Sequence, residues 1–79
     1  MRYDFYYSDE LGVHRGEVDG NDPRDAVVNA ARKCTDILEE CEGSLAPVVT
    51  VARGKDGAFD AHIDTHGLGD LYVRLEQEQ

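Results

Sequence analysis

The chain has 79 residues, of which 17 are Asp or Glu and eight are Lys or Arg, so its formal net charge at pH 7 is −9. We expect one domain, residues 1–79, with no room for a deep catalytic cleft, and its charge disfavours direct binding to nucleic acid. No apolar run is long enough to span a bilayer and the N-terminus does not resemble a signal peptide, so we expect a soluble, cytoplasmic protein without membrane contact.

Two strands joined by a tight turn are the first elements predicted. Gly12 suits the positive φ of a short hairpin loop, and residues 13–19 form the return strand. The faces of this return strand are poorly distinguished, so we expect it at or near an edge, with Gly16 marking a bulge or a close contact. In residues 3–8, every second side chain is aromatic and points to one side of the strand: Tyr3, Phe5 and Tyr7.

A helix is predicted next, because Asp22 is a good N-cap and Pro23 stands at the favoured first helical position. Apolar residues then recur at helical spacing as far as Cys41, which predicts about five turns. Gly43 provides the C-terminal stop, and Pro47 prevents the helix from resuming.

Three further strands are predicted after the helix. Residues 48–53 are β-branched and indicate a central strand, followed by a hairpin turn at residues 54–57. Residues 59–64 and 71–75 alternate between apolar and polar side chains, and residues 76–79 are expected to form a frayed tail. The order ββαβββ predicts an α+β fold, an antiparallel sheet of about five strands with one long helix packed on one face.

No motif in the chain indicates an enzyme. Cys34 and Cys41 are separated by about 10.5 Å along the predicted helix, too far for a disulfide, and buried thiols in a reducing compartment are the simplest interpretation. An exposed Cys41 forming an intermolecular bridge is the alternative. Asp60, His62 and Asp64 share the outward face of one strand, but side chains two apart diverge, so a metal site needs a ligand from a neighbouring strand. A solvated acidic face is the simpler interpretation of these three residues.

Acidic residues define the candidate partner-binding surface. Several crowd the end of the predicted helix, where the macrodipole disfavours negative charge, and this cost indicates either a functional surface or a frayed helix end. Others lie on the outward face of the last two strands, where a tyrosine offers an aromatic anchor. The predicted surface consists of Asp36, Glu39, Glu40, Glu42, Asp60, Asp64, Asp70 and Tyr72.

The density of these charges limits what they can imitate. Seventeen carboxylates spread evenly over a surface of about 4,800 Å² occupy roughly 280 Å² each, whereas duplex DNA presents one phosphate per roughly 110 Å². Mimicry of DNA therefore requires the acids to be concentrated on one side of the molecule.

In size, charge and element order the whole chain resembles the small acidic anti-CRISPR proteins of phages and mobile elements, a group that shares no diagnostic motif. This resemblance implies a DNA-mimic inhibitor in the cytoplasm of a bacterial host cell, which needs no cofactor. Its acids would pair with Lys and Arg of a Cas protein or Cascade-type complex and block the binding of target DNA.

Two further interpretations come from other classes of protein. The first is a small interaction module that dimerises through its open sheet face, favoured by the aromatic run from Tyr3 to Tyr7. The second is a divalent-metal binder that uses Asp60, His62 and Asp64. The chain is thus expected to be a monomer or a homodimer that binds a basic protein surface.

Overall fold

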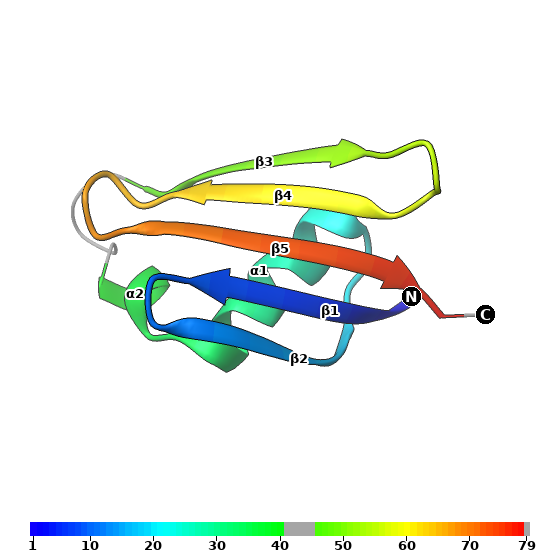
Figure 1. The fold of residues 1–79 in the computed structure, drawn as a ribbon, viewed down its shortest axis with the longest axis horizontal. Helices are drawn as coiled ribbons and strands as arrows, with labels where there is room; N and C mark the ends of the chain where they lie inside the picture. Colours follow the sequence, from blue (N-terminus) through cyan, green and yellow to red (C-terminus); the bar gives the residue numbers. More distant parts are fainter. Residues whose placement is uncertain (41–45, 79) are drawn as a thin grey trace.

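The fold is α+β, as predicted, in a computed structural model that describes residues 1–40 and 46–78. The strands are β1 (Arg2–Asp9), β2 (Gly12–Asp19), β3 (Val48–Arg53), β4 (Phe59–Asp64) and β5 (Asp70–Gln77), and the helices are α1 (Pro23–Cys34) and α2 (Ile37–Glu40). The five strands form one antiparallel sheet in the order β2-β1-β5-β4-β3. Figure 1 shows α1 lying across one face of this sheet and α2 at one end of it.

The core lies between α1 and the sheet. Strands β1, β4 and β5 alternate as the sequence predicts, and small residues of α1 let the helix lie close to them. Removing this apolar surface from water, at about 25 cal/mol per Å², is the main force that holds the two layers together. The buried side chains of this core are Tyr3, Phe5, Tyr7, Val18, Ala61, Ile63, Leu71, Val73 and Leu75 of the sheet, Ala26, Val27, Ala30 and Ala31 of α1, and Leu38 of α2.

The two edge strands are β2 and β3. The edge position of β2 confirms the prediction, and Gly16 lies in regular register opposite Phe5, where an added Cβ would meet the Phe5 ring at 3.2 Å. Gly16 therefore marks a close contact, and the alternative of a bulge is wrong. The prediction of β3 as a central strand is also wrong, because β5 returns to the middle of the sheet and pairs with both β1 and β4.

The predicted frayed tail is wrong for most of its length. Gln77 lies opposite Tyr3 and Glu76 opposite Asp4, so the end of β5 is paired along β1. The ladder continues one step further, because the backbone N–H of Glu78 donates to the carbonyl oxygen of Arg2 at 3.1 Å. Pairing with β5 along most of its length therefore holds β1 inside the sheet, between β2 and β5.

The predicted five-turn helix is wrong in its length. The helix α1 ends at Cys34, because Thr35 has an extended backbone (φ −155°, ψ 154°) and its N–H makes the last bond, to the carbonyl oxygen of Ala31. The Thr35 hydroxyl oxygen then accepts a bond from the N–H of Ile37 at 3.3 Å, at the start of α2. Thr is a poor residue inside a helix and a good one at an N-cap, so the helix breaks and restarts there.

This break changes the electrostatics of the helix. Glu39 lies in α2 and Asp36 lies just before it, while the last turn of α1 carries Arg32 and Lys33, whose positive charge the dipole of α1 favours. The predicted conflict between acids and the dipole of one long helix therefore does not arise. The predicted end and stop of that helix lie outside the described residues: Cys41 and Gly43.

Candidate protein-binding surface

The sheet face opposite α1 is charged, and Arg74 lies near the middle of it, opposite Tyr6 of β1 and Asp60 of β4. Arg74 of β5 pairs with Asp56 at 2.5 Å, with Asp60 at 3.2 Å and with Glu76 at 3.7 Å. The hydrogen bond from Arg74 holds the pKa of Asp56 below its usual value. These carboxylates are neutralised within the molecule, so they contribute little to a field that a partner would sense.

A second arginine organises the neighbouring corner of the same face. Arg2 pairs with Glu17 at 2.5 Å and with Glu78 at 3.4 Å, and Asp4 completes a group whose ligand-type oxygens lie within 4.8 Å of one another. The hydrogen bond from Arg2 lowers the pKa of Glu17. Desolvation, together with the nearby Asp4 and Glu17, raises the pKa of Glu78. The guanidinium of Arg2 already supplies the positive charge that this carboxylate group attracts.

The mutual repulsion in this corner predicts that Glu78→Gln stabilises the protein at neutral pH. Because folding raises the pKa of Glu78, ionisation of this carboxyl favours the unfolded chain as the pH rises above its ordinary pKa of 4.5. Thermal melts should show a higher midpoint for Glu78→Gln at about pH 7 and no difference near pH 3, where both states are protonated. A lower midpoint at neutral pH would mean that the ion pair with Arg2 outweighs the repulsion.

The opposite end of the molecule carries acids that pair with no Lys or Arg in the described part of the chain. Figure 1 shows that the β1–β2 turn, α2 and the β4–β5 turn meet at this end. We call this surface the acidic end. It consists of the carboxylates Asp9, Glu10, Asp36, Glu39, Asp64 and Asp70, and of the apolar residues Leu11, Ile37 and Leu68 that lie among them.

Apolar side chains occupy the middle of the acidic end. A shallow hollow of about 200 Å³ is lined by residues 9–11, by Ile37 of α2 and by residues 68–71. Leu11 is 94% exposed and Leu68 is 49% exposed, so each leaves apolar surface in water. An apolar centre inside a charged rim is the usual anatomy of a protein-binding surface.

Asp9 fixes the turn that presents Leu11. One carboxylate oxygen of Asp9 accepts bonds from the backbone N–H groups of Leu11 and Gly12, at 2.8 and 3.0 Å. The other accepts the hydroxyl of Tyr7 at 2.7 Å, and this bond keeps the pKa of Asp9 low. Because Tyr7 is buried, the turn is anchored to the core and Leu11 is held outward on a rigid support.

Asp64 and Asp70 lie directly opposite each other on β4 and β5. Like charges in this position destabilise a sheet. Asp64 accepts the backbone N–H of His66 at 2.9 Å, and Asp70 bonds Nε2 of His62 at 3.0 Å. The His62 ring in turn stacks on Tyr72, with ring centroids 5.1 Å apart.

The structure separates the predicted site residues into groups. Asp60, Asp64, Asp70 and Tyr72 share the open sheet face, but Asp60 is engaged by Arg74 while Asp64 and Asp70 belong to the acidic end. Asp36 and Glu39 are exposed at the same end, on or beside α2. The backbone of Glu40 lies in α2, and Glu42 falls outside the described residues.

Sequence reasoning missed the apolar part of this surface. Leu11 stands in the turn of Asp9–Gly12, where a polar residue is usual. This apolar residue in a turn was the feature of the sequence that could have indicated an exposed apolar contact. The alternative metal site is not assembled from its strand, since Asp60, His62 and Asp64 each bond a different group. Cys34 is half-buried, and burial raises the pKa of its thiol.

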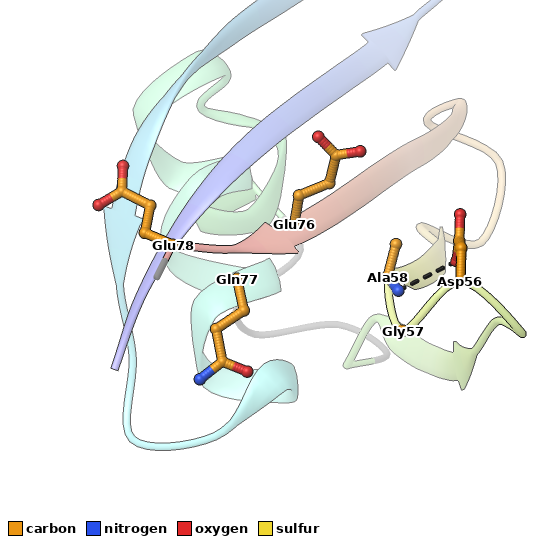
Figure 2. A pocket seen from close by; sticks show the side chains of 6 residues that line it. All are labelled: Asp56, Gly57, Ala58, Glu76, Gln77 and Glu78. Carbon is orange, nitrogen blue, oxygen red and sulfur yellow. Dashed lines mark hydrogen bonds between the residues drawn. The ribbon is translucent and has the colours of Figure 1, made fainter.

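A larger hollow lies at the other end of the molecule, beside the β3–β4 turn, with a volume of about 600 Å³. Figure 2 shows that its acidic side chains do not converge on one point. Asp56 turns back to accept the N–H of Ala58 at 3.0 Å, and Glu76 and Glu78 point in different directions. A site that binds a small ligand needs convergent polar groups, which this hollow lacks in its described residues.

None of the helices among residues 1–40 and 46–78 has the length and apolar character needed to cross a membrane. Comparison of the chain with protein-family models, with curated proteins and with solved structures found no match in any of the three.

Proposed function

We propose that this chain is a small acidic binding protein that places its acidic end against a basic surface of a partner protein. The observation that carries this proposal is the uneven pairing of its acids. None of the six carboxylates of the acidic end has a Lys or Arg partner among the described residues. Of the nine other carboxylates whose side chains the structure describes, five pair with Arg2 or Arg74, and Asp4, Asp19, Asp22 and Asp25 do not.

The acidic end fits a partner whose Lys and Arg surround an apolar depression. Leu11 and Leu68 offer exposed apolar surface at the centre, and a bound partner would remove this surface from water. Most of the binding energy of an interface is found at such a centre. The rim of carboxylates steers the approach of the partner and selects against acidic surfaces. Binding should therefore weaken strongly as salt is added, and the apolar centre should contribute affinity that salt does not screen.

The specific partner that we propose is the DNA-receiving surface of a CRISPR-Cas surveillance complex. The resemblance to acidic anti-CRISPR proteins supports this choice, and so does the group of six acids at one end that pair with no Lys or Arg among the described residues. A bound acidic end would cover the Lys and Arg that receive target DNA, and inhibition would be steric and would need no cofactor.

The test is a pull-down of the tagged protein from lysates that contain a type I CRISPR surveillance complex. We expect the complex to be retained at low salt, to be lost at high salt and to be displaced by target DNA. In the triple variant Glu10→Gln, Asp36→Asn and Glu39→Gln, retention should fall about tenfold or more, because the variant loses three unpaired charges from the acidic end.

A matched control removes the same number of charges from the other end, with Asp19→Asn, Glu76→Gln and Glu78→Gln. This control should retain the complex as well as the unmodified protein does. Equal losses in both triple variants would show that net charge alone governs binding, and this would contradict a role for the acidic end. No retention at low salt would contradict the proposed partner.

A second candidate function is dimerisation through the open sheet face. It is favoured by an apolar hollow of about 350 Å³ on that face, lined in part by Tyr6, Val13 and Tyr72. Val13 is 74% exposed and Tyr72 is 52% exposed. A dimer in sedimentation equilibrium that persists at high salt would support this candidate, because apolar contacts are little affected by screening.

A further inference from the structure

The two edges of the sheet differ in how their outward backbone groups are used. In the antiparallel ladder, even-numbered residues of β2 pair with β1, so its odd-numbered residues direct their N–H and C=O groups away from the sheet. Side chains of α1 cover two of these carbonyl oxygens. Lys33 donates to that of Glu17 at 2.9 Å, and Asn29 donates to that of Asp19 at 3.0 Å.

The β3 edge is more open. Its even-numbered residues pair with β4, so Val49, Val51 and Arg53 direct their backbone groups outward. Arg24 donates to the carbonyl oxygen of Val49 at 2.7 Å. The outward groups of Val51 and Arg53 have no hydrogen-bond partner among the residues that the structure describes.

The side chains of β3 add to this openness. On the open sheet face they are short, namely Val48, Thr50 and Ala52, and all three are exposed. Edge strands are commonly protected by charged side chains, proline or bulges, and β3 carries none of these before Arg53. On the helix side, Val49 and Val51 are only half-buried, so an added strand would complete their burial.

Acidic side chains stand one strand behind this edge. Asp60 and Asp64 of β4 lie opposite Ala52 and Val48, and both carboxylates are exposed. Asp60 is shared with Arg74, whereas Asp64 pairs with no Lys or Arg among the described residues and is the stronger attraction for a cation. Neighbouring strands in a sheet are about 4.8 Å apart, so a strand added beside β3 would lie about 9.6 Å from β4. A long Lys or Arg side chain on the added strand can extend over the short side chains of β3 toward the acids of β4. Side chains on one face of an extended chain recur every two residues, so positions i and i+4 of an added strand can lie level with Asp60 and Asp64.

We propose that the β3 edge binds an extended segment of a partner protein by strand addition, with Lys or Arg at alternate positions on the open face and apolar residues between them. Main-chain hydrogen bonds to Val51 and Arg53 would hold the segment, and its side chains would set the specificity. The inference concerns the edge of the sheet, which shares only Asp64 with the acidic end, and it does not require the rest of that end to bind a partner. A second copy of this chain is disfavoured as the occupant, because each copy has a net charge of −9.

The test uses the whole protein and a short capped peptide that alternates Lys and Val. Amide hydrogen exchange, followed residue by residue by NMR, should slow by about tenfold or more at Val51 and Arg53 when the peptide saturates the protein. The outward amide of Val13 on β2 should keep its rate. A peptide that alternates Glu and Val should have no effect on β3.

Val51→Pro removes one outward N–H without touching the β3–β4 ladder, so it should abolish peptide binding. Val13→Pro makes the same change at the other edge and should leave binding intact. Ala52→Lys, which keeps the backbone unchanged and repels the peptide, should weaken binding even if Val51→Pro fails to fold. The inference is overturned if the exchange rates of Val51 and Arg53 do not change, if the Glu peptide protects them equally, or if protein alone protects them at high concentration, which would identify a second copy as the occupant.

Discussion

Leu11→Ala is expected to raise the dissociation constant of the partner complex by about 30-fold, which corresponds to the loss of roughly 2 kcal/mol at an interface hot spot. The side chain is 94% exposed, so its removal takes no contact from the core and the protein should unfold at an unchanged temperature. The change alters no charge, so the loss separates the apolar contribution from the electrostatic one. Calorimetric titration against the complex recovered in the pull-down measures it.

Val13→Ala is the matched control for this prediction. Val13 is also strongly exposed, but it lies on the open sheet face, away from the hollow that contains Leu11. If the acidic end is the interface, Val13→Ala leaves the dissociation constant unchanged. If instead Val13→Ala raises the dissociation constant and Leu11→Ala does not, the interface lies on the open sheet face. If neither variant changes the dissociation constant, the carboxylates bind the partner without an apolar centre.

The surface predicted from the sequence and the acidic end proposed from the structure differ for a physical reason. The acids on one strand were placed correctly, because side chains alternate with a period of two and Asp60 and Asp64 must share a face. Whether an acid is neutralised depends on its neighbour in space. Asp60 meets Arg74, which is 14 residues away in the chain, and Asp64 meets Asp70. Register across strands, which the sequence pattern alone does not specify, therefore decides which acids remain available.

The same distinction separates the correct and incorrect predictions about the fold. Element types and buried faces followed from local periodicity, as in β1, β4 and β5. The position of β3 at an edge depends on where β5 inserts, a long-range choice that the β-branched residues of β3 do not reveal. The helix break had a local signal, since Thr35 has a hydroxyl that can accept a bond from a backbone N–H group and favours a helix end, but the continuous apolar stripe concealed it.

Gly20→Ala is expected to lower the free energy of unfolding by about 3 kcal/mol, the upper end of the usual cost of overpacking. Gly20 joins β2 to α1 and is buried, and it exchanges backbone hydrogen bonds with Met1 at 2.9 and 3.0 Å. An added Cβ would lie 2.5 Å from the backbone nitrogen of Ala26 and 2.7 Å from its Cα. These are backbone atoms in the first part of α1, so they cannot rotate away as a flexible side chain could.

Relief of this clash requires α1 to move away from the sheet or the β1–β2 ladder to open at its end. For a domain of this size the melting temperature should fall by roughly 15 °C. Gly16→Ala is the control, because its added Cβ meets only the ring of Phe5 at 3.2 and 3.3 Å, and a ring can shift. If Gly20→Ala melts at the same temperature as Gly16→Ala, the close approach of α1 to the end of β2 is not what positions the helix.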